Sequence, residues 1–330
     1  MEEIRLGTIG SGVIVHSVLG NVLRTPGIRL TAVYSRSQEK GDALAAEFGA
    51  KKVYTDMDAF LADEDTNFVY IATPNLLHYP QAKKALLAGK NVILEKPFCT
   101  TADHARELVA LAREKGLFLI DAVPTAFLPN LEVLKEALPK IGKVKLVQAN
   151  YSQYSSRYDL LLKGEMMPNI FNPEFAGGCL MDINFYNLYL NIALFGKPQS
   201  AMYYPNIYPG AADTSGIVVM NYDGFVSESA GAKDTWGVNF FQIEGETGYI
   251  YVAGGSNGLA EVRVVTKTSD ETINRQSDPD RWFYEVQNLT ALVLADDHSA
   301  IEARQDVMLN VMEVLETVRR NAGIRFPGDR

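Results

Sequence analysis

The sequence predicts an α/β domain with a doubly wound parallel sheet, followed by an α+β domain with a mostly antiparallel open sheet. Over residues 1–121, short apolar runs alternate with segments of helical spacing, which is typical of a parallel sheet with helices on both faces. From residue 122 onward, strand-like runs follow one another closely, as in an antiparallel sheet. A chain of 330 residues is long enough for two domains, and we place them at 1–121 and 122–330.

The elements of the first domain alternate in order along the chain. A strand over 4–9 precedes a helix over 13–25, whose apolar residues recur at helical spacing. Gly49 should end the second helix, and Thr100 with Asp103 should form a capping box for the last one. The remaining strands are expected at 28–35, 68–73, 91–95 and 117–121, and the remaining helices at 38–48, 78–88 and 101–115.

The second domain is dominated by strands. Asp223-Gly224, between two strand-like runs, is a hairpin signal. A long C-terminal helix is expected over about 300–322, with Ser299 and Glu302 at its start and Gly323 at its end. The strand-like runs cover 143–154, 216–222, 225–231, 239–244, 248–252 and 260–267.

Composition and charge exclude several classes of protein. Asp and Glu number 40 against 31 Lys and Arg, and the resulting net charge of −9 disfavours binding to nucleic-acid phosphates. The N-terminus lacks the basic and apolar regions of a signal peptide, and the apolar stretch 179–195 is too short and too polar to span a bilayer. Cys99 and Cys179 form no disulfide framework, and the four histidines have no metal-ligand spacing. We therefore expect a cytoplasmic protein that binds neither nucleic acid, membrane nor metal.

A glycine-rich turn links the first strand to the first helix. Gly10-Ser11-Gly12 lies where the pyrophosphate of a dinucleotide binds, so Gly10, Gly12, Val13 and Ile14 are candidate cofactor-binding residues. Val15 replaces the third glycine of the usual G-x-G-x-x-G pattern, which predicts a slightly wider approach of helix and strand. Such glycines also serve in simple turns, but the flanking strand and helix favour a dinucleotide-binding Rossmann domain.

The end of the second strand indicates which dinucleotide binds. NAD-binding domains usually carry a carboxylate here for the ribose hydroxyl, whereas this chain has Ser35, Arg36 and Ser37, with Lys40 nearby. Hydroxyls and cations suit a 2′-phosphate, because a guanidinium binds phosphate with two hydrogen bonds. The alternative is a solvated arginine beside a serine that caps the next helix. We favour NADP(H) over NAD(H).

Two longer segments resemble a known family. Residues 72–97 read ATPNLLHYPQAKKALLAGKNVILEKP, and residues 171–186 read FNPEFAGGCLMDINFY. Both resemble the Gfo/Idh/MocA oxidoreductases, in which a Rossmann domain precedes an open antiparallel sheet. The resemblance extends from the glycine loop to the C-terminal helix, and it implies an NAD(P)-dependent oxidoreductase. It also implies that Thr73, Pro74, Asn75 and His78 lie in a loop that approaches the cofactor, which agrees with ligand binding beyond the ends of parallel strands.

The segment Glu95-Lys96-Pro97 ends the next strand at the same edge of the sheet. In the family this lysine lies beside the nicotinamide and the substrate, so the resemblance gives Lys96 that role, with Glu95 and Pro97 as cofactor-binding neighbours. An exposed loop cation is the alternative for Lys96. Proline also restricts the preceding residue to an extended backbone, which helps to aim the lysine side chain.

The helix after Gly177-Gly178 departs from the usual family pattern. Many members carry Asp and, four residues later, His, whereas this chain has Asp182 and Tyr186. Branches similar to dimeric dihydrodiol dehydrogenase and glucose–fructose oxidoreductase use Tyr at this point. At α-helical spacing, Asp182, Tyr186 and Tyr189 share one face. Our hypothesis is that Tyr186 exchanges the alcohol proton, Lys96 tunes and orients it, and Asp182 holds a substrate hydroxyl. A core aromatic is the alternative for Tyr186.

We expect hydride transfer between NADP(H) and a carbinol or carbonyl carbon of a small sugar-like or cyclic hydroxy compound. Sugar-active relatives often carry Arg where this chain has Ala126, so the substrate need not be a standard sugar. A non-catalytic cofactor-binding sensor on the same fold is the alternative function. The family pairs its C-terminal sheets between subunits, and the resemblance therefore implies a homodimer or a larger oligomer.

Overall fold

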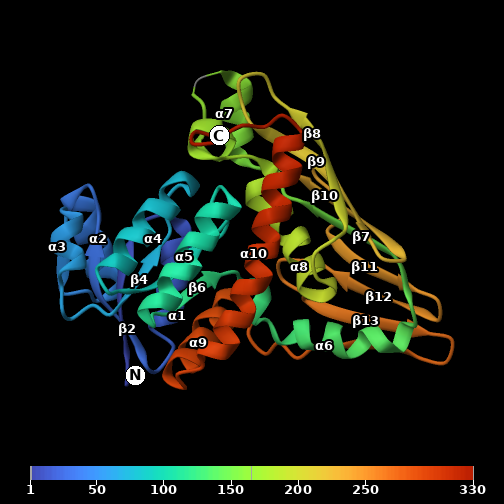
Figure 1. The fold of residues 1–330 in the computed structure, drawn as a ribbon, viewed down its shortest axis with the longest axis horizontal. Helices are drawn as coiled ribbons and strands as arrows, with labels where there is room; N and C mark the ends of the chain where they lie inside the picture. The colour runs from blue at the N-terminus through green and yellow to red at the C-terminus, as the bar shows by residue number, and fades with distance from the viewer. Residues whose placement is uncertain (1, 165, 330) are drawn as a thin grey trace. The chain divides into compact units, whose positions relative to one another are not determined.

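The chain folds into two compact units in a computed structural model, which describes residues 2–164 and 166–329. The first unit contains residues 2–123 and 282–308, and the second contains residues 124–281 and 309–329. Each unit is built around one sheet, and Figure 1 labels most of the elements of both.

The first unit holds a six-stranded sheet in the order β3-β2-β1-β4-β5-β6, and every pair in it is parallel. Its strands are buried on both faces except at the edge, because helices cover both sides. This confirms the doubly wound parallel sheet. The strands are β1 (Ile4–Ile9), β2 (Ile28–Tyr34), β3 (Lys52–Tyr54), β4 (Phe68–Ile71), β5 (Asn91–Glu95) and β6 (Leu119–Ala122).

Four helices of this unit match predicted ones within three residues at each end, whereas the short α3 was not predicted. Gly49 ends the second helix in the left-handed conformation, as expected. The capping prediction at the last helix is wrong by one residue, because Thr101 rather than Thr100 accepts the hydrogen bond from the His104 N–H. Figure 1 shows α4 and α5 packed side by side. The helices are α1 (Val13–Val22), α2 (Gln38–Phe48), α3 (Met57–Leu61), α4 (His78–Leu87) and α5 (Ala102–Lys115).

A C-terminal segment also belongs to the first unit, which differs from the boundary expected at residue 122. Residues 282–308 include most of α9 (Arg281–Leu294) and the first part of α10 (His298–Asn321). The Gln305 amide donates to the buried Leu119 carbonyl over 2.9 Å. This hydrogen bond attaches the C-terminal segment to β6, an edge strand of the parallel sheet. Asp297, not Ser299, accepts from the Ala300 N–H at the start of α10, and Gly323 follows its end as predicted.

The second unit holds an eight-stranded sheet in the order β14-β13-β12-β11-β7-β10-β9-β8. All neighbouring strands are antiparallel except β7 and β10, which confirms a mostly antiparallel sheet. Asp223 and Gly224 form the two-residue turn between β9 and β10, as predicted. The strands are β7 (Val144–Ser152), β8 (Ser200–Ile207), β9 (Asp213–Tyr222), β10 (Phe225–Ala232), β11 (Phe240–Gly245), β12 (Gly248–Ala253), β13 (Glu261–Thr266) and β14 (Asp270–Ile273).

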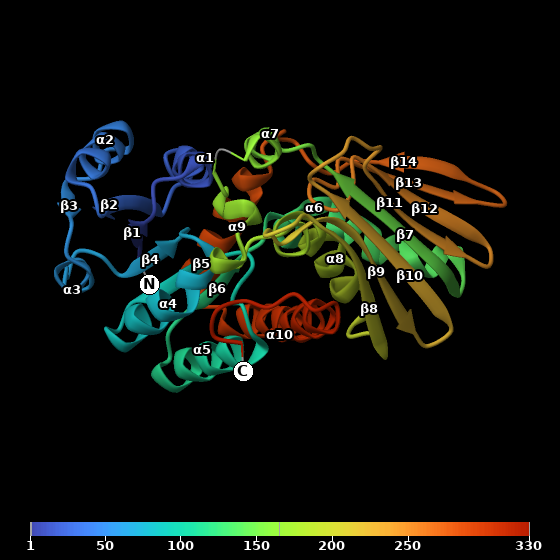
Figure 2. The same ribbon diagram turned by 90° about the horizontal axis from the view of Figure 1, so that it is seen from above.

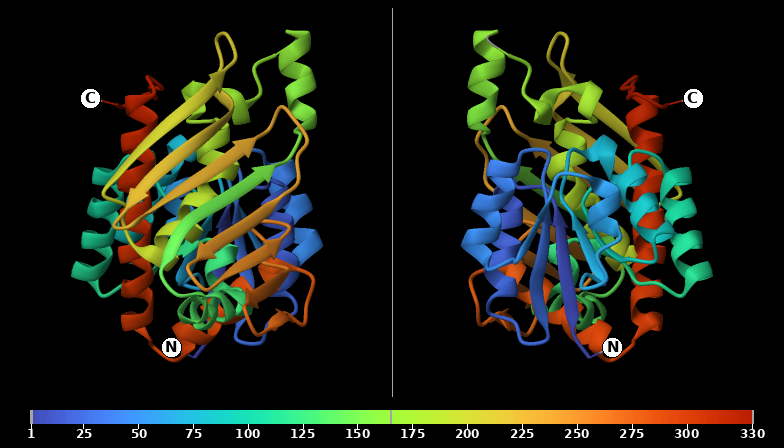
Figure 3. Two further views of the ribbon diagram at one scale, coloured as in Figure 1. Left: turned by 90° about the vertical axis from the view of Figure 1, so that its right-hand side faces the viewer. Right: turned by 90° about the vertical axis from the view of Figure 1, so that its left-hand side faces the viewer.

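The two faces of this sheet differ in cover. The inner face carries buried apolar side chains such as Val147, Phe241 and Ile250, which pack beneath α8 (Phe185–Phe195) and α6 (Pro129–Ala137). Figure 2 shows both helices on one side of the sheet. Figure 3 shows the opposite face, which no helix of the described part of this unit covers.

Candidate functional site

A cleft of about 360 Å³ lies at the carboxyl edge of the parallel sheet in the first unit. It brings together the loops that follow β1, β2 and β4, where an open α/β sheet binds ligands. Eight of the residues expected to bind the cofactor line it: Gly10, Gly12, Ser35, Arg36, Ser37, Lys40, Thr73 and Pro74.

The glycine loop fits a dinucleotide pyrophosphate. Gly10 has φ of +122°, and a Cβ there would lie 2.5 Å from the Ala72 carbonyl oxygen, so only glycine fits. Nothing lies within 4 Å of a Cβ built on Gly12, which leaves open space above the N-terminus of α1. No side chain caps this helix, so its first N–H groups can bind an anion. Val13 and Ile14 form this first turn, although their side chains point into solvent rather than into the cleft.

The segment after β2 presents polar groups to the same cleft. The Ser37 hydroxyl caps α2 by accepting from the Lys40 N–H, so one part of the alternative interpretation is correct. Ser35 accepts from the Ser37 N–H over 3.2 Å, and its own O–H can still be donated. Arg36 and Lys40 are exposed at the rim. No carboxylate is among the residues that line this cleft.

His78 ties two loops of this edge together. Its Nδ1 lies 2.9 Å from the Pro97 carbonyl oxygen, and its Nε2 lies 2.8 Å from that of Thr73. The ring is fully buried, and this burial lowers the pKa of His78. The side chain therefore positions the loops after β4 and β5, and it does not line the cleft as expected.

The residues at the end of β5 are held from within the sheet. Glu95 is buried and accepts a 2.7 Å hydrogen bond from the Tyr70 hydroxyl and a 3.1 Å bond from the Lys96 N–H. Lys96 is half-buried, and its bond to the buried Pro97 is cis. Asn75 lies in a 3₁₀ turn and, like Glu95 and Pro97, is absent from the cleft lining.

The segment that carries Asp182 is a π-helical turn, Leu180–Asn184, which leads into α8. The α-helical spacing assumed between Asp182 and Tyr186 is therefore wrong, because a π-turn holds more residues. Asp213 anchors the turn by accepting a 2.6 Å hydrogen bond from the Leu180 N–H. Gly178 is required beside it, since its φ is +126° and a Cβ would lie 2.2 Å from an Asp213 oxygen. Burial raises the pKa of Asp213 to about 6.

Asp182 forms an ion pair with Lys233, which the sequence did not reveal. The Lys233 ammonium donates to Asp182 Oδ2 from the end of β10. Only 5% of the lysine side chain is exposed, compared with 27% of the aspartate side chain. A charge this deeply buried requires a partner, and the carboxylate is the more accessible member of the pair.

Tyr186 lies in an aromatic and cationic environment. The residue is 4% exposed, and the Tyr151 ring lies edge-on to the Tyr186 ring with 6.0 Å between the ring centres. The Arg281 guanidinium carbon lies 5.6 Å from the centre of the Tyr186 ring, a distance typical of a cation–π contact. Asn257 donates to the Tyr151 hydroxyl and accepts from Arg281, so a polar network surrounds the ring.

Three buried asparagines connect the π-turn and α8 to the sheet by hydrogen bonds. Asn184 donates to the Ser229 carbonyl over 3.0 Å, and Asn187 donates to the Ala230 carbonyl over 2.8 Å. Asn191 accepts from the Ser227 hydroxyl over 2.7 Å. This ladder explains why a nearly apolar helix carries regularly spaced amides.

The two cysteines and Ala126 lie outside the cleft described above. Cys99 and Cys179 are buried free thiols, and burial raises the pKa of each. Ala126 lies in a short 3₁₀ segment, Pro124–Phe127. Among the residues that the structure describes, no group of three His, Cys, Asp or Glu could hold a metal ion. Within 2–164 and 166–329, no helix is both long and apolar enough to cross a bilayer.

Comparisons with known proteins agree with this geometry. The family model described as "Oxidoreductase family, NAD-binding Rossmann fold" matches residues 4–121, and that of the "GFO/IDH/MocA C-terminal domain" matches residues 136–251. The chain is 33% identical to the scyllo-inositol 2-dehydrogenase (NADP(+)) IolU of Bacillus subtilis, over 99% of both chains. It is 25% identical to mouse trans-1,2-dihydrobenzene-1,2-diol dehydrogenase, again over 99% of both.

The fold also matches solved structures. A 3-ketoreductase, KijD10 from Actinomadura kijaniata, in complex with NADP and TDP-benzene, superposes with a TM-score of 0.84 at 22% identity, covering 96% of this chain and 97% of the other. At that identity the match supports the fold alone. The family resemblance inferred from the motifs is confirmed by the family models and the curated relatives, and the chain belongs to the Gfo/Idh/MocA family of NAD(P)-dependent oxidoreductases.

Proposed function

We propose that this enzyme transfers a hydride between NADP(H) and a carbinol carbon of a cyclic polyhydroxy or sugar-like compound. The observation that carries the proposal is the pair of polar centres described above. One is the cleft with the glycine loop, and the other is the Asp182–Tyr186 segment. The names of the relatives support the substrate class, because scyllo-inositol and a cyclic trans-diol both have ring carbinols beside further hydroxyls.

The preference for NADP(H) rests on the segment after β2. A 2′-phosphate in the cleft would meet Ser35, Arg36 and Lys40, and no lining carboxylate would repel it. The name of the B. subtilis relative also specifies NADP(+). NAD(H) would lack the carboxylate that usually binds its ribose hydroxyl.

Three residues are assigned chemical roles. Bound cofactor supplies or accepts the hydride. Tyr186 takes the proton from the carbinol oxygen during oxidation and returns it during reduction. Lys96 stabilises negative charge on the reacting oxygen, the role implied by the family resemblance. Asp182 accepts a hydrogen bond from another substrate hydroxyl. His78 and Glu95 serve as positioning residues for the loops that carry Thr73 and Lys96.

A titration followed by a substrate screen tests the function. Cofactor-free protein is titrated with NADPH and with NADH while the nicotinamide fluorescence is followed. Cyclic polyols and the matching ketones are then screened for turnover. Tight NADPH binding with turnover of a ring polyol is the expected result. Binding without turnover of any polyol or ketone would favour the non-catalytic sensor, and binding of neither nucleotide would overturn the proposal.

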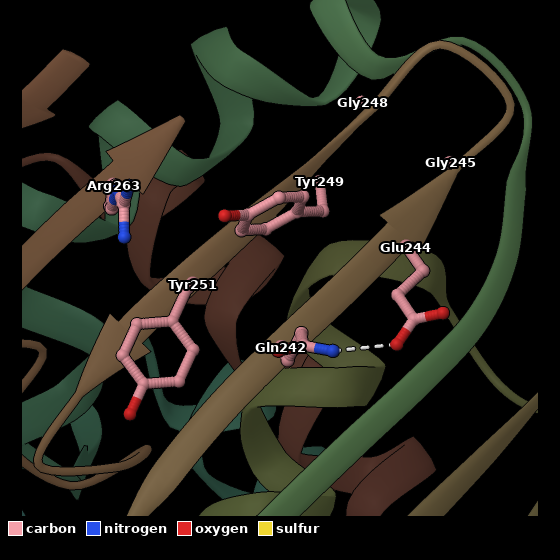
Figure 4. Close-up of a pocket in the computed structure, with 7 residues that line it drawn as sticks. All are labelled: Gln242, Glu244, Gly245, Gly248, Tyr249, Tyr251 and Arg263. Atoms are coloured by element: carbon pink, nitrogen blue, oxygen red, sulfur yellow. Dashed lines mark hydrogen bonds between the residues drawn. The ribbon is translucent and has the colours of Figure 1, made fainter. Parts of the chain in front are cut away.

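We also propose that the uncovered face of the eight-stranded sheet pairs with a second copy. Met202, Tyr204, Ile217 and Val226 are exposed on it, although side chains of this kind are usually buried. Figure 4 shows the neighbouring part, a pocket of about 510 Å³ over β11, β12 and β13, with Tyr249, Tyr251 and Arg263 among its lining residues. Light scattering should give at least twice the monomer mass, and a monomer would contradict the pairing.

A further inference from the structure

Lys233, a lysine that the sequence motifs did not single out, pairs with Asp182 in the second unit. It follows the last residue of β10, 51 positions from Asp182 in the sequence. We propose that Lys233 is a specificity-determining positioning residue: it holds the Asp182 carboxylate as an acceptor for a substrate hydroxyl next to the reacting carbon. This inference rests on the proposed function.

The main chain at Lys233 is fixed on both sides. Its N–H donates to the Thr214 carbonyl over 2.8 Å, and its carbonyl accepts from the Ser155 N–H over 2.9 Å. The next residue, Asp234, accepts from the hydroxyls of Thr214 and Ser215. The ammonium therefore starts from a rigid base, which a positioning residue requires.

Asp182 is fixed from the opposite direction. Its own N–H donates to the Gly178 carbonyl over 3.1 Å, and the π-turn begins at the Leu180 N–H bond to Asp213. Both backbones that carry the ion pair are thus tied into the structure independently. The carboxylate loses little conformational freedom when a ligand reaches it, because its partner has already ordered it.

The difference in exposure between Lys233 and Asp182 determines which of the two a ligand can reach. The lysine side chain is nearly inaccessible, whereas about a quarter of the aspartate side chain is open to solvent. An ionised carboxylate only accepts hydrogen bonds, and its two oxygens offer about four lone-pair positions. A ligand that approaches the pair therefore finds an acceptor backed by a buried positive charge. A hydroxyl suits it because it can donate, whereas an ionised phosphate or carboxylate oxygen has no proton to donate to it.

The chemical consequence concerns substrates with adjacent hydroxyls. A site built to accept one particular hydroxyl rejects an analogue that lacks it, because the polar group is then left unpaired. Lys233 should therefore affect the discrimination between a vicinal diol and a simple alcohol more than it affects hydride transfer itself.

The test uses the full-length protein saturated with NADP⁺ and two probes, trans-1,2-cyclohexanediol and cyclohexanol. Dissociation constants are measured by calorimetry, and kcat and KM by NADPH formation. The wild type should prefer the diol at least about tenfold in kcat/KM. Lys233→Met keeps an unbranched side chain of similar length but removes the charge. It should lower the preference about tenfold, mainly through KM, with kcat for cyclohexanol within about twofold of the wild type.

Two further variants separate positioning from folding. Asp182→Asn should lose the same preference, and the double variant should lose no more than the worse single variant, since both act on one interaction. Lys90→Met is the matched control, because the Lys90 ammonium is also buried and donates to the carbonyls of Asp63 and Thr66. It should leave the preference unchanged.

The outcomes distinguish this inference from the proposed function. Equal losses for diol and alcohol in Lys233→Met, or an unchanged preference, would overturn the role of Lys233. A wild type that binds the diol without oxidising it would contradict the proposed function. The role of Lys233 would then be tested by comparing the dissociation constants for the diol and for cyclohexanol. A wild type that neither binds nor oxidises either probe would overturn both.

Discussion

The Asp213 carboxylate accepts a 2.6 Å hydrogen bond from the backbone N–H of Leu180, the residue at which the π-helical turn begins. The Tyr203 hydroxyl donates to the same oxygen over 2.6 Å. A fully buried acid thus ties the turn that carries Asp182 to the start of β9. This arrangement places an ionisable group in the interior, so the contribution of Asp213 to stability depends on pH.

Asp213→Asn should reduce the free energy of unfolding by roughly 1–3 kcal/mol, because an amide cannot reproduce every hydrogen bond of the carboxylate. The pKa of Asp213 is raised in the folded protein to about 6, so its protonated form is favoured by folding. The contribution of Asp213 is therefore full below about pH 4 and declines as pH rises through 6. The cost of the substitution should fall by about 1 kcal/mol between pH 5 and pH 7.5.

Urea unfolding at the two pH values measures this difference. Asp223→Asn, at an exposed hairpin turn, is the matched control and should change stability equally at both. A cost that grows from pH 5 to pH 7.5 in Asp213→Asn would reverse the sign and contradict the argument.

Tyr186→Phe should lower kcat about 100-fold or more, since it removes the hydroxyl assigned to proton transfer while leaving the packing of the ring intact. The dissociation constant for NADPH should stay within about twofold, because Tyr186 is not among the residues that line the proposed cofactor cleft. Tyr189→Phe, at another buried tyrosine of α8, serves as the control. Near-normal turnover in Tyr186→Phe would exclude the phenol as the proton carrier.

Much of the fold could be predicted because its signals are local. The helix predicted over 38–48 has the bounds of α2, and Gly49 ends it. Asp223-Gly224 likewise lies at the turn of the β9–β10 hairpin. The three strands that the sequence did not reveal, β3, β8 and β14, are all edge strands. An edge strand buries few side chains, so its apolar alternation is weak; only Tyr203 is buried in β8.

The site was predictable only in part, for a related reason. The glycine loop and the Lys96 segment are contiguous motifs, and they can be read from neighbouring residues. Lys233 and Asp213 approach the π-turn from 51 and 33 positions away, without any motif of their own. The π-turn itself has no sequence pattern distinct from a helix, so the face that Asp182 occupies could not be deduced.

Arg36→Ala should lower the preference for NADPH over NADH about 10- to 100-fold, the effect of losing a charge-assisted hydrogen bond of about 1.5–3 kcal/mol. Ser35→Asp should favour NADH, because it introduces a carboxylate where NAD-binding domains carry one. Fluorescence titration with both nucleotides measures the ratio. Arg29→Ala is the control, because it removes an exposed cation of the same unit that does not line the cleft. It should leave the ratio of NADPH to NADH affinity unchanged. An unchanged ratio in Arg36→Ala would mean that no 2′-phosphate binds there.

Asn187→Leu should destabilise the protein by about 2–4 kcal/mol. The Asn187 amide donates to Asn184 and Ala230 and accepts from the Ser256 hydroxyl, so a leucine would leave several buried polar groups without a partner. Chemical denaturation measures the loss. Asn221→Leu, at an exposed position of β9, should change stability by less than about 0.5 kcal/mol. Equal losses at the two positions would show that the ladder contributes no specific stability.

Tyr204→Glu should dissociate the proposed dimer. Tyr204 is 58% exposed and lies opposite Ile217 in the register of β8 and β9, near Met202, so it would be buried by a second copy of the sheet. Burying a carboxylate there without a partner costs several kcal/mol, which is enough to shift the equilibrium to monomers at micromolar concentration. Leu162→Glu adds the same charge at an exposed apolar position on α7 (Ser156–Lys163) and should leave the mass unchanged. Sedimentation velocity of the three proteins measures the mass, and a dimer that persists in Tyr204→Glu would place the interface on another face.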